Sequence, residues 1–120
     1  MAQILVIDDS AVEVYQLTTL LKEMGHEALS ASNGAEGIAL AQQHHPDLIL
    51  MDIVMPGLNG FQATRQLSKL PAVSSIPVVI ITHKDQETDR VWAQRQGAKE
   101  YLVKPITEER LRQLFTELAL

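Results

Sequence analysis

Cysteine is absent from the 120 residues of this chain, and basic residues are outnumbered by acidic ones. Without thiols the chain can form neither a disulfide framework nor a thiolate metal site. It has 10 basic and 15 acidic residues, a net charge of −5, and no run of basic residues. Because direct binding of nucleic acid needs positive charge to meet the phosphates, these features argue against a nucleic-acid partner.

Long hydrophobic runs are absent too. No apolar stretch reaches the roughly 18 residues that a membrane-spanning helix needs. The N-terminus has no basic start, and Asp8 and Asp9 interrupt its apolar segment, so it lacks the pattern of a signal peptide. We therefore expect a cytoplasmic protein with no membrane insertion. The length fits a single domain over residues 1–120.

Short apolar runs recur along the chain. They are "ILVI", "LILM", "VVII" and "YLV", with a weaker run "EALSA", and they occupy residues 4–7, 48–51, 78–81, 101–103 and 27–31. Short, β-branched runs of this kind are typical of strands that are buried on both faces. The sequence therefore predicts five strands.

Helices are predicted between and after these strands. In the first interval, apolar residues follow i, i+3, i+7 and i+10 spacing from Val14 to Met24, and Gly25 then supplies a C-terminal stop. Later helices are expected after the turn signal at 33–34, after Asn59, over residues 85–96 and after Thr107.

This alternation predicts an α/β fold, a doubly wound (βα)5 arrangement in which a five-stranded parallel sheet has helices on both faces. In such sheets ligands bind outside the carboxyl ends of the strands, where the strand order reverses. A functional site is therefore expected among the residues that directly follow the strands.

Polar residues do gather at these positions. They are Asp8 and Asp9 after the first strand, Asp52 after the third, Thr82 after the fourth and Lys104 after the fifth. A single aspartate after a strand is usually a turn or cap residue. Five compatible groups at the ends of four strands are hard to explain in that way, so we expect them to form one site.

The residue types indicate the chemistry of this site. Three carboxylates cannot all stay ionised in a tight cleft without a cation, and oxygen ligands without histidine or cysteine favour a hard ion such as Mg²⁺. An aspartate can act as a nucleophile and carry a phosphoryl group. A metal ion, the amine of Lys104 and the hydroxyl of Thr82 would then neutralise or bind the oxygens of that group.

The motifs around these residues resemble those of response-regulator receiver domains of two-component signalling. They are "DDS" after the first strand, "MDIVMPGLNG" around Asp52, Thr82 at the end of the fourth strand and "YLVKP" at the end of the fifth. The resemblance covers essentially the whole chain. It implies the flavodoxin-like receiver fold, with strand order 2-1-3-4-5, and a single receiver domain with no output domain.

The resemblance also implies how phosphorylation is made and read. Asp52 is the phosphoacceptor, and Lys104, whose bond to Pro105 is expected to be cis, contacts the phosphoryl group. Thr82 turns inward to that group, and Tyr101 follows into the vacated space. Phosphorylation is thereby coupled to the surface of the fourth helix, fifth strand and fifth helix, where a downstream protein target is expected to bind.

The metal ligands follow from the same resemblance. Asp9, Asp52 and the backbone carbonyl of Val54 are expected to bind Mg²⁺ directly, and Asp8 is expected to act mostly through metal-bound water. Receivers of this family take phosphate from a histidine kinase and also lose it by their own hydrolysis. We therefore expect a protein that promotes only its own phosphorylation and dephosphorylation, not an enzyme acting on other substrates.

Two longer segments resemble a narrower group. "DIVMPGLNGFQATRQL" and "THKDQETDRVWAQRQGAKEYLVKP" are similar to twitching-motility receivers of the PilH type, which belong to chemosensory systems that control type IV pili. This implies a chemotaxis-kinase-like partner. Output through a protein target and competition for phosphate as a sink are both open.

Three positions near the site depart from the common receiver pattern. His83 stands directly after Thr82, where the family usually has a small residue, and its imidazole could narrow access to the acyl phosphate. Val54, two residues after Asp52, cannot position a water molecule through its side chain. Lys84, two residues after Thr82, is basic where many relatives differ. Slow self-dephosphorylation is therefore predicted.

Three other functions compete with that of a receiver. A Mg²⁺-dependent phosphatase or phosphotransferase with an aspartyl-phosphate intermediate usually needs a second acid two residues after the nucleophile, where this chain has Val54, and a cap for its substrate. A flavodoxin-like cofactor binder would need a Ser-, Thr- and Gly-rich turn in place of Asp8 and Asp9. A pseudo-receiver that binds partners without phosphorylation is left open by His83.

Overall fold

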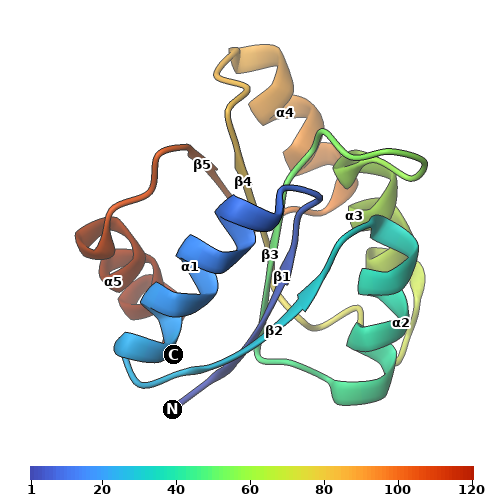
Figure 1. The fold of residues 1–120 in the computed structure, drawn as a ribbon. Coiled ribbons are helices and arrows are strands. Elements are labelled where there is room, and N and C mark those ends of the chain that lie inside the picture. The colour runs from blue at the N-terminus through green and yellow to red at the C-terminus, as the bar shows by residue number, and fades with distance from the viewer.

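The computed structural model describes residues 1–120 and contains five strands that alternate with five helices (Figure 1). The strands are β1 (Gln3–Ile7), β2 (Glu27–Ala31), β3 (Leu48–Met51), β4 (Val78–Thr82) and β5 (Glu100–Val103). The helices are α1 (Ala11–Glu23), α2 (Gly34–His44), α3 (Gly60–Lys69), α4 (Glu87–Gln96) and α5 (Glu108–Glu117).

All neighbouring strands pair in parallel, in the order β2-β1-β3-β4-β5. The order reverses between β1 and β3, so the ends of these two strands lie at the switch point of the sheet. This confirms the predicted doubly wound α/β fold and its strand order. The molecule has a radius of gyration of 12.8 Å, close to the roughly 13 Å typical of a folded domain of this size.

The helix ends follow the local signals closely, with one difference. Helix α1 ends at Glu23, and Gly25 has a φ of 91°, a left-handed conformation that glycine adopts at little cost. The fourth helix was expected from residue 85 but begins at Glu87, and its N-cap, Gln86, makes no side-chain capping bond. Asp85 therefore lies outside the helix, one residue before its N-cap.

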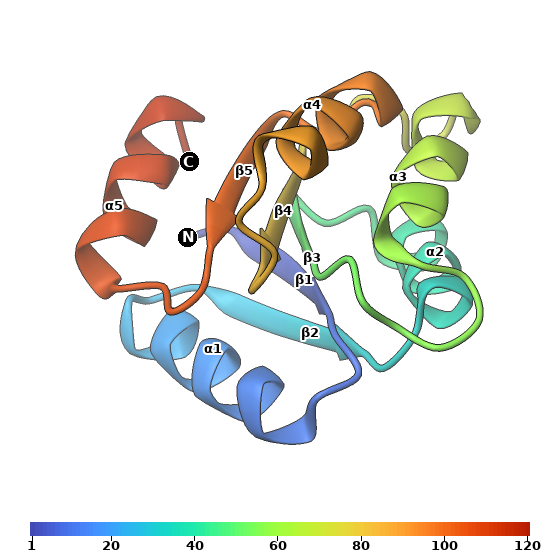
Figure 2. The same cartoon turned by 90° about the horizontal axis from the view of Figure 1, so that it is seen from above.

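The two faces of the sheet carry separate cores, because side chains alternate along each strand. Even-numbered residues of β1 and β3 pack with α1 and α5; this core includes Ile4, Val6, Leu48, Leu50, Val79, Ile81, Leu102, Leu21, Leu111, Leu114 and Phe115. The other face packs with α2, α3 and α4 through Leu5, Ile7, Ile49, Met51, Val78, Ile80, Tyr101, Ile38, Ala63, Leu67 and Ala93. Figure 2 shows α1 and α5 on one side of the sheet and α2 and α3 on the other.

Gly60 fixes the loop between β3 and α3. A Cβ at this position would meet the backbone carbonyl of Asp52 and the Cα of Ile53. The N–H of Gly60 also donates to the carbonyl of Ile53 at 2.9 Å. The first turn of α3 therefore lies directly on the backbone of Asp52 and holds that residue in place.

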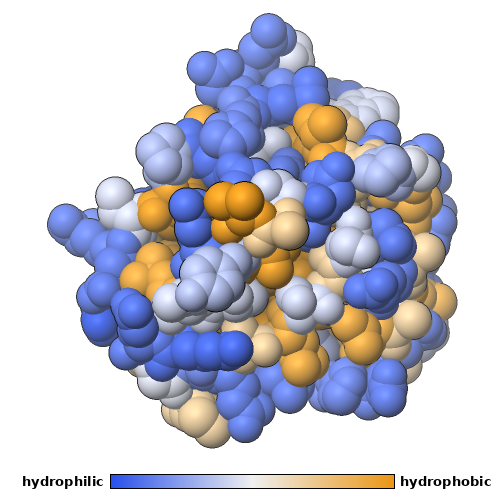
Figure 3. All heavy atoms as spheres, in the orientation of Figure 1, coloured by the Kyte–Doolittle hydropathy of each residue, from blue (hydrophilic) through white to orange (hydrophobic).

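Polar side chains cover much of the surface. In the view of Figure 3 they cover the end of the molecule at α4, and apolar areas appear as separate spots between polar ones. The largest exposed apolar side chains near the carboxyl edge are Val12 and Tyr15 on α1 and Val54 after β3. None of the helices combines the length and hydropathy that crossing a bilayer requires.

Candidate functional site

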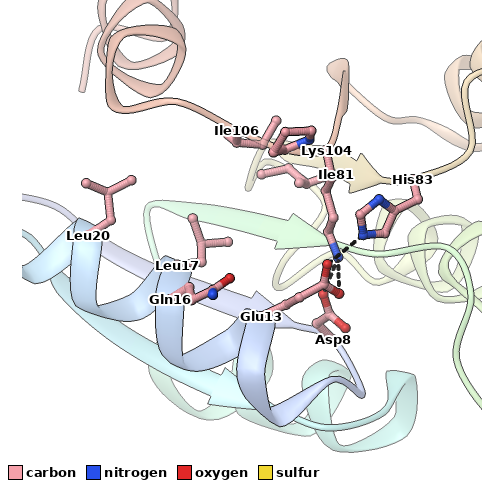
Figure 4. Close-up of a pocket in the computed structure, with 10 residues that line it drawn as sticks. Asp8, Glu13, Gln16, Leu17, Leu20, Ile81, His83, Lys104 and Ile106 are labelled. Atoms are coloured by element: carbon pink, nitrogen blue, oxygen red, sulfur yellow. Dashed lines mark hydrogen bonds and ion pairs between the residues drawn. The ribbon is translucent and has the colours of Figure 1, made fainter.

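Lys104 lies at the centre of a polar cluster at the carboxyl edge of the sheet. Its Nζ donates to Oδ2 of Asp8 at 2.7 Å, to Oε2 of Glu13 at 2.9 Å and to Oδ2 of Asp52 at 2.9 Å. An ammonium group has three donors, so each of them has a carboxylate partner. The side chain of Lys104 is only 8% exposed. Figure 4 shows it reaching from the end of β5 toward Asp8 and Glu13.

The sheet itself brings these residues together. Backbone bonds continue the ladder beyond the strands: Asp8 N donates to Ala31 O, Asp52 N to Ile7 O and Lys104 N to Thr82 O, at 3.1, 3.0 and 2.8 Å. Asp8, Asp52 and Lys104 each stand two residues beyond a core residue on the face covered by α1 and α5. Strand alternation therefore directs all three side chains to the same face.

The two aspartates of the cluster are buried, and their oxygens have partners. Oδ1 of Asp8 accepts from the N–H of Ser10 at 2.9 Å. Oδ1 of Asp52 accepts from the N–H of Ile53 at 2.6 Å and weakly from that of Val54 at 3.4 Å. Backbone donors thus fix one oxygen of each carboxylate and leave Oδ2 facing Lys104.

Glu13 completes the cluster, although sequence reasoning at the strand ends did not identify it. It lies in the first turn of α1, three residues after the N-cap Ser10. Its Oε2 accepts from Lys104, and its Oε1 lies 2.6 Å from Nε2 of His83. Its position in the sequence could have identified it, because a helix that directly follows a strand has its first turn at the carboxyl edge of the sheet.

Burial and mutual contact set the charges of this cluster. Burial raises the pKa of Asp8, although the bonds from Lys104 and Ser10 act in the other direction. The hydrogen bond from Lys104 lowers the pKa of Glu13. Burial alone would lower the pKa of Lys104, but its contacts with Asp8, Asp52 and Glu13 outweigh burial and raise it. Lys104 is therefore a fixed positive charge at neutral pH.

The donor set fits a hard divalent cation. Carboxylate oxygens of Asp8, Glu13 and Asp52 all lie within 4.8 Å of one another. When ionised, the three carboxylates exceed the single ammonium by two negative charges, which a divalent ion would balance. With oxygen atoms as the only donors, Mg²⁺ is a suitable ion. A bound cation would also favour the charged form of Asp8, which burial disfavours.

Asp9 is not brought into this cluster. Its side chain is exposed, and it lines a second hollow between α1 and β2, with Asp8, Tyr15 and Glu36 among the other lining residues. Val54 is 59% exposed beside the site. Direct metal contact by Asp9 and by the Val54 carbonyl, and an indirect role for Asp8, therefore stay predictions.

Thr82 and Tyr101 are buried on the other side of β4 and β5, and the backbone of Lys84 lies between them. Oγ1 of Thr82 accepts from the N–H of Lys84 at 3.4 Å, and the hydroxyl of Tyr101 donates to the carbonyl of Lys84 at 2.8 Å. Burial, followed by the charge of Asp89, raises the pKa of Tyr101 to about 12. The guanidinium of Arg90 lies 5.0 Å from the centre of the ring. The loop after β4 thus connects the two side chains.

A cavity of about 190 Å³ opens beside Lys104, between α1 and the segment that follows β5. The Lys104–Pro105 peptide bond in this segment is cis, as the resemblance implies. The polar end of the cavity is formed by Asp8, Glu13, His83 and Lys104, and the rest is lined by Gln16, Leu17, Leu20, Ile81, Pro105 and Ile106. A ligand can therefore approach the buried amine from this side.

Comparison with known proteins supplies independent evidence. Protein PilH of Pseudomonas aeruginosa is 62% identical over 111 residues, which cover 92% of this chain and 92% of that protein. The chemotaxis protein CheY4 of Vibrio cholerae has a TM-score of 0.92 at 27% identity, over 98% of each chain. The receiver domain of sensor histidine kinase PA1611 from Pseudomonas aeruginosa shares the fold, with a TM-score of 0.91 at 24% identity over 99% of this chain and 98% of that one. The last structure has a magnesium ion in its active site cleft.

Residues 4–116 match the family described as "Response regulator receiver domain". The match covers every member of the Lys104 cluster and all of the strands and helices except the first residue of β1 and the last residue of α5. The resemblance proposed from the motifs is thereby confirmed, and the chain belongs to the response regulator receiver domain family.

Proposed function

We propose that this chain is a phosphorylation-dependent signalling switch that accepts a phosphoryl group on Asp52 from a histidine kinase. The contact that carries this proposal is the bond from the Lys104 amine to Oδ2 of Asp52, at 2.9 Å within a buried, anionic cluster. It sets a positive charge beside the oxygen that would receive the group. The family and the 62% identity to Protein PilH support the same function.

The transfer needs a nucleophile and charge neutralisation. Oδ2 of Asp52 attacks the phosphorus of a phosphohistidine; the O–P bond forms, the N–P bond breaks, and the electron pair of that bond returns to the imidazole. Lys104 stays beside the transferred group and offsets its negative charge. A bound Mg²⁺ would supply further neutralisation. Asp9, Asp52 and the Val54 carbonyl would hold it, as the family implies, and Asp8 would act mostly through metal-bound water.

The contacts of Lys84 support a route from the site to the surface. If Thr82 turns to bind the phosphoryl group, its bond from the Lys84 backbone breaks, and the bond between Lys84 and Tyr101 is disturbed with it. This would change the surface of α4, β5 and α5, on which the partner is proposed to bind. Phosphorylation would act by shifting the population between two arrangements of this surface.

The pathway is inferred from the most similar relative reported above. A chemotaxis-like histidine kinase as donor and a role in twitching motility by type IV pili agree with the similarity to Protein PilH. Output is proposed through a protein partner, and action as a phosphate sink is the alternative within the same function.

His83 is proposed to slow the loss of phosphate. Its imidazole lies at the rim of the site beside Glu13, and the side chain is 67% exposed. A bulky ring at this position restricts the approach of water to the acyl phosphate. The apolar side chain of Val54, 59% exposed next to Asp52, offers no group that could orient such a water.

Intact-mass measurement tests the function. The protein is incubated with acetyl phosphate and Mg²⁺, alongside Asp52→Asn. We expect one phosphoryl adduct in the wild type and none in the variant, and we expect chelation of Mg²⁺ to suppress the adduct. Absence of an adduct with acetyl phosphate and with a phosphorylated chemotaxis-type kinase would favour a pseudo-receiver and contradict the proposal.

A further inference from the structure

Glu13 does not make the local contact that its position predicts. In α2, Glu36 occupies the equivalent place and turns back to accept from the N–H of Ser32 at 3.3 Å. Ser32 stands one residue before the N-cap of α2. In α1 the N–H from which a capping-box glutamate would accept, that of the N-cap Ser10, donates instead to Oδ1 of Asp8 at 2.9 Å. The pattern Ser-x-x-Glu is typical of a capping box. Because Asp8 takes over the backbone donor, both oxygens of Glu13 are available to the site.

Each oxygen of Glu13 contacts a residue from a different strand end. Oε2 accepts from Lys104, which follows β5, and Oε1 lies 2.6 Å from Nε2 of His83, which follows β4. The Glu13 side chain is 30% exposed, between the buried Lys104 and the exposed His83. Figure 4 shows the ring of His83 turned toward Glu13, beside the end of Lys104.

We propose that Glu13 is a positioning residue that holds the imidazole of His83 over the phosphorylation site, so that restriction of water by His83 depends on Glu13. This inference rests on the proposed function, because it concerns the lifetime of phosphorylated Asp52. An exposed side chain without a partner samples several rotamers. The contact with Glu13, itself fixed by Lys104, selects the rotamer that lies beside the acyl phosphate.

The reaction controlled in this way is hydrolysis. The oxygen of a water molecule attacks phosphorus, the bond between phosphorus and Oδ2 of Asp52 breaks, and the carboxylate and inorganic phosphate are released. If Glu13 holds His83 in place, removal of either side chain opens the same path. The two substitutions should then not add.

The first experiment measures decay of the phosphorylated protein in Glu13→Ala, His83→Ala and the double variant. Glu36→Ala is the matched control, since it removes a glutamate from the first turn of α2, as Glu13→Ala does from the first turn of α1. Loss of one hydrogen bond to a charged group predicts about tenfold faster decay in either single variant, and no further acceleration in the double variant. Decay that is multiplied in the double variant, or unchanged in Glu13→Ala, would overturn the proposal.

The second experiment does not depend on phosphorylation. The ring signals of His83 are recorded by NMR in the unphosphorylated wild type, in Glu13→Ala and in Glu36→Ala. We expect them to shift to the positions of a free histidine side chain in Glu13→Ala only. Unchanged ring signals would overturn the positioning role. Shifted signals in a protein that forms no phosphoryl adduct would instead show that the contact exists and that the proposed function fails.

Discussion

Helices α1 and α2 both begin with a polar N-cap whose side chain accepts from the backbone of a glutamate three residues later. Oγ of Ser10 accepts from Glu13 N at 3.3 Å, and Oδ1 of Asn33 accepts from Glu36 N at 2.8 Å. The glutamate side chains nevertheless differ. Glu36 is exposed and contacts only its own turn, whereas Glu13 contacts Lys104 and His83 across the sheet edge.

The strands that precede these helices account for the difference. Helix α1 follows a central strand and packs on the face to which Asp8, Asp52 and Lys104 point. Helix α2 follows β2, an edge strand that ends in Ala31 and Ser32 without a charged group. The local pattern therefore determines where a helix begins, and the neighbouring strand ends determine what its first-turn glutamate does.

Removal of Lys104 should have the largest effect on the free energy of unfolding. Its ammonium group contacts the first turn of α1, and α2 has no such partner. In Lys104→Met, three carboxylates lose their buried partner, and the free energy of unfolding should fall by about 3 kcal/mol. Mg²⁺ should restore part of this loss. Urea unfolding with and without Mg²⁺ measures both effects. Lys99→Met, at an exposed position before β5, is the control, and an equal loss in that variant would contradict the account.

Substitution of Glu13 should reduce the free energy of unfolding by a smaller amount than removal of Lys104, but by more than substitution of Glu36. Glu13→Gln removes a charge-assisted bond to Lys104 and should lower the free energy of unfolding by about 1.5 kcal/mol. Glu36→Gln changes an exposed residue and should stay within about 0.5 kcal/mol of the wild type. Urea midpoints compare the two directly. Equal effects would mean that Glu13 is no more than a capping residue.

The smallest expected difference is in how the stability of the wild type and of Glu13→Gln depends on acid pH. The bond from Lys104 lowers the native pKa of Glu13 below its ordinary 4.5, so the unfolded chain binds this proton more readily than the native protein. The contact therefore stabilises the fold above about pH 4.5, and its contribution is lost as the pH falls through the lower native value. Between pH 6 and 3, urea midpoints should fall more steeply in the wild type than in Glu13→Gln. Parallel profiles would show that the contact has no such effect.

Most of the fold could be predicted from the sequence, because strand burial and helix periodicity act locally. The strand order needed the family resemblance, since apolar runs do not say which strands are neighbours. Helix α4 was less well predicted: Asp85 is a common capping residue, yet the helix begins after Gln86. A polar helix with weak periodicity leaves such a boundary poorly determined.

The site was predicted in part. Residue type and position identified Asp8, Asp52 and Lys104, which the structure brings together. Alternation along β1 could also have separated Asp8 from Asp9, because Asp8 continues the face of Ile4 and Val6. Glu13 could not be separated from an ordinary capping residue, since its contacts depend on side chains 70 and 91 positions away.

Asp52, among the carboxylates at this edge, is the residue that we propose to carry the phosphoryl group. Borohydride reduces an acyl phosphate at an aspartate to homoserine, so reduction of the phosphorylated protein followed by peptide mass spectrometry locates the acceptor. The account predicts homoserine at position 52 and unmodified aspartates at 8 and 9. Reduction at Asp8 or Asp9, or of Glu13, in place of Asp52 would contradict it.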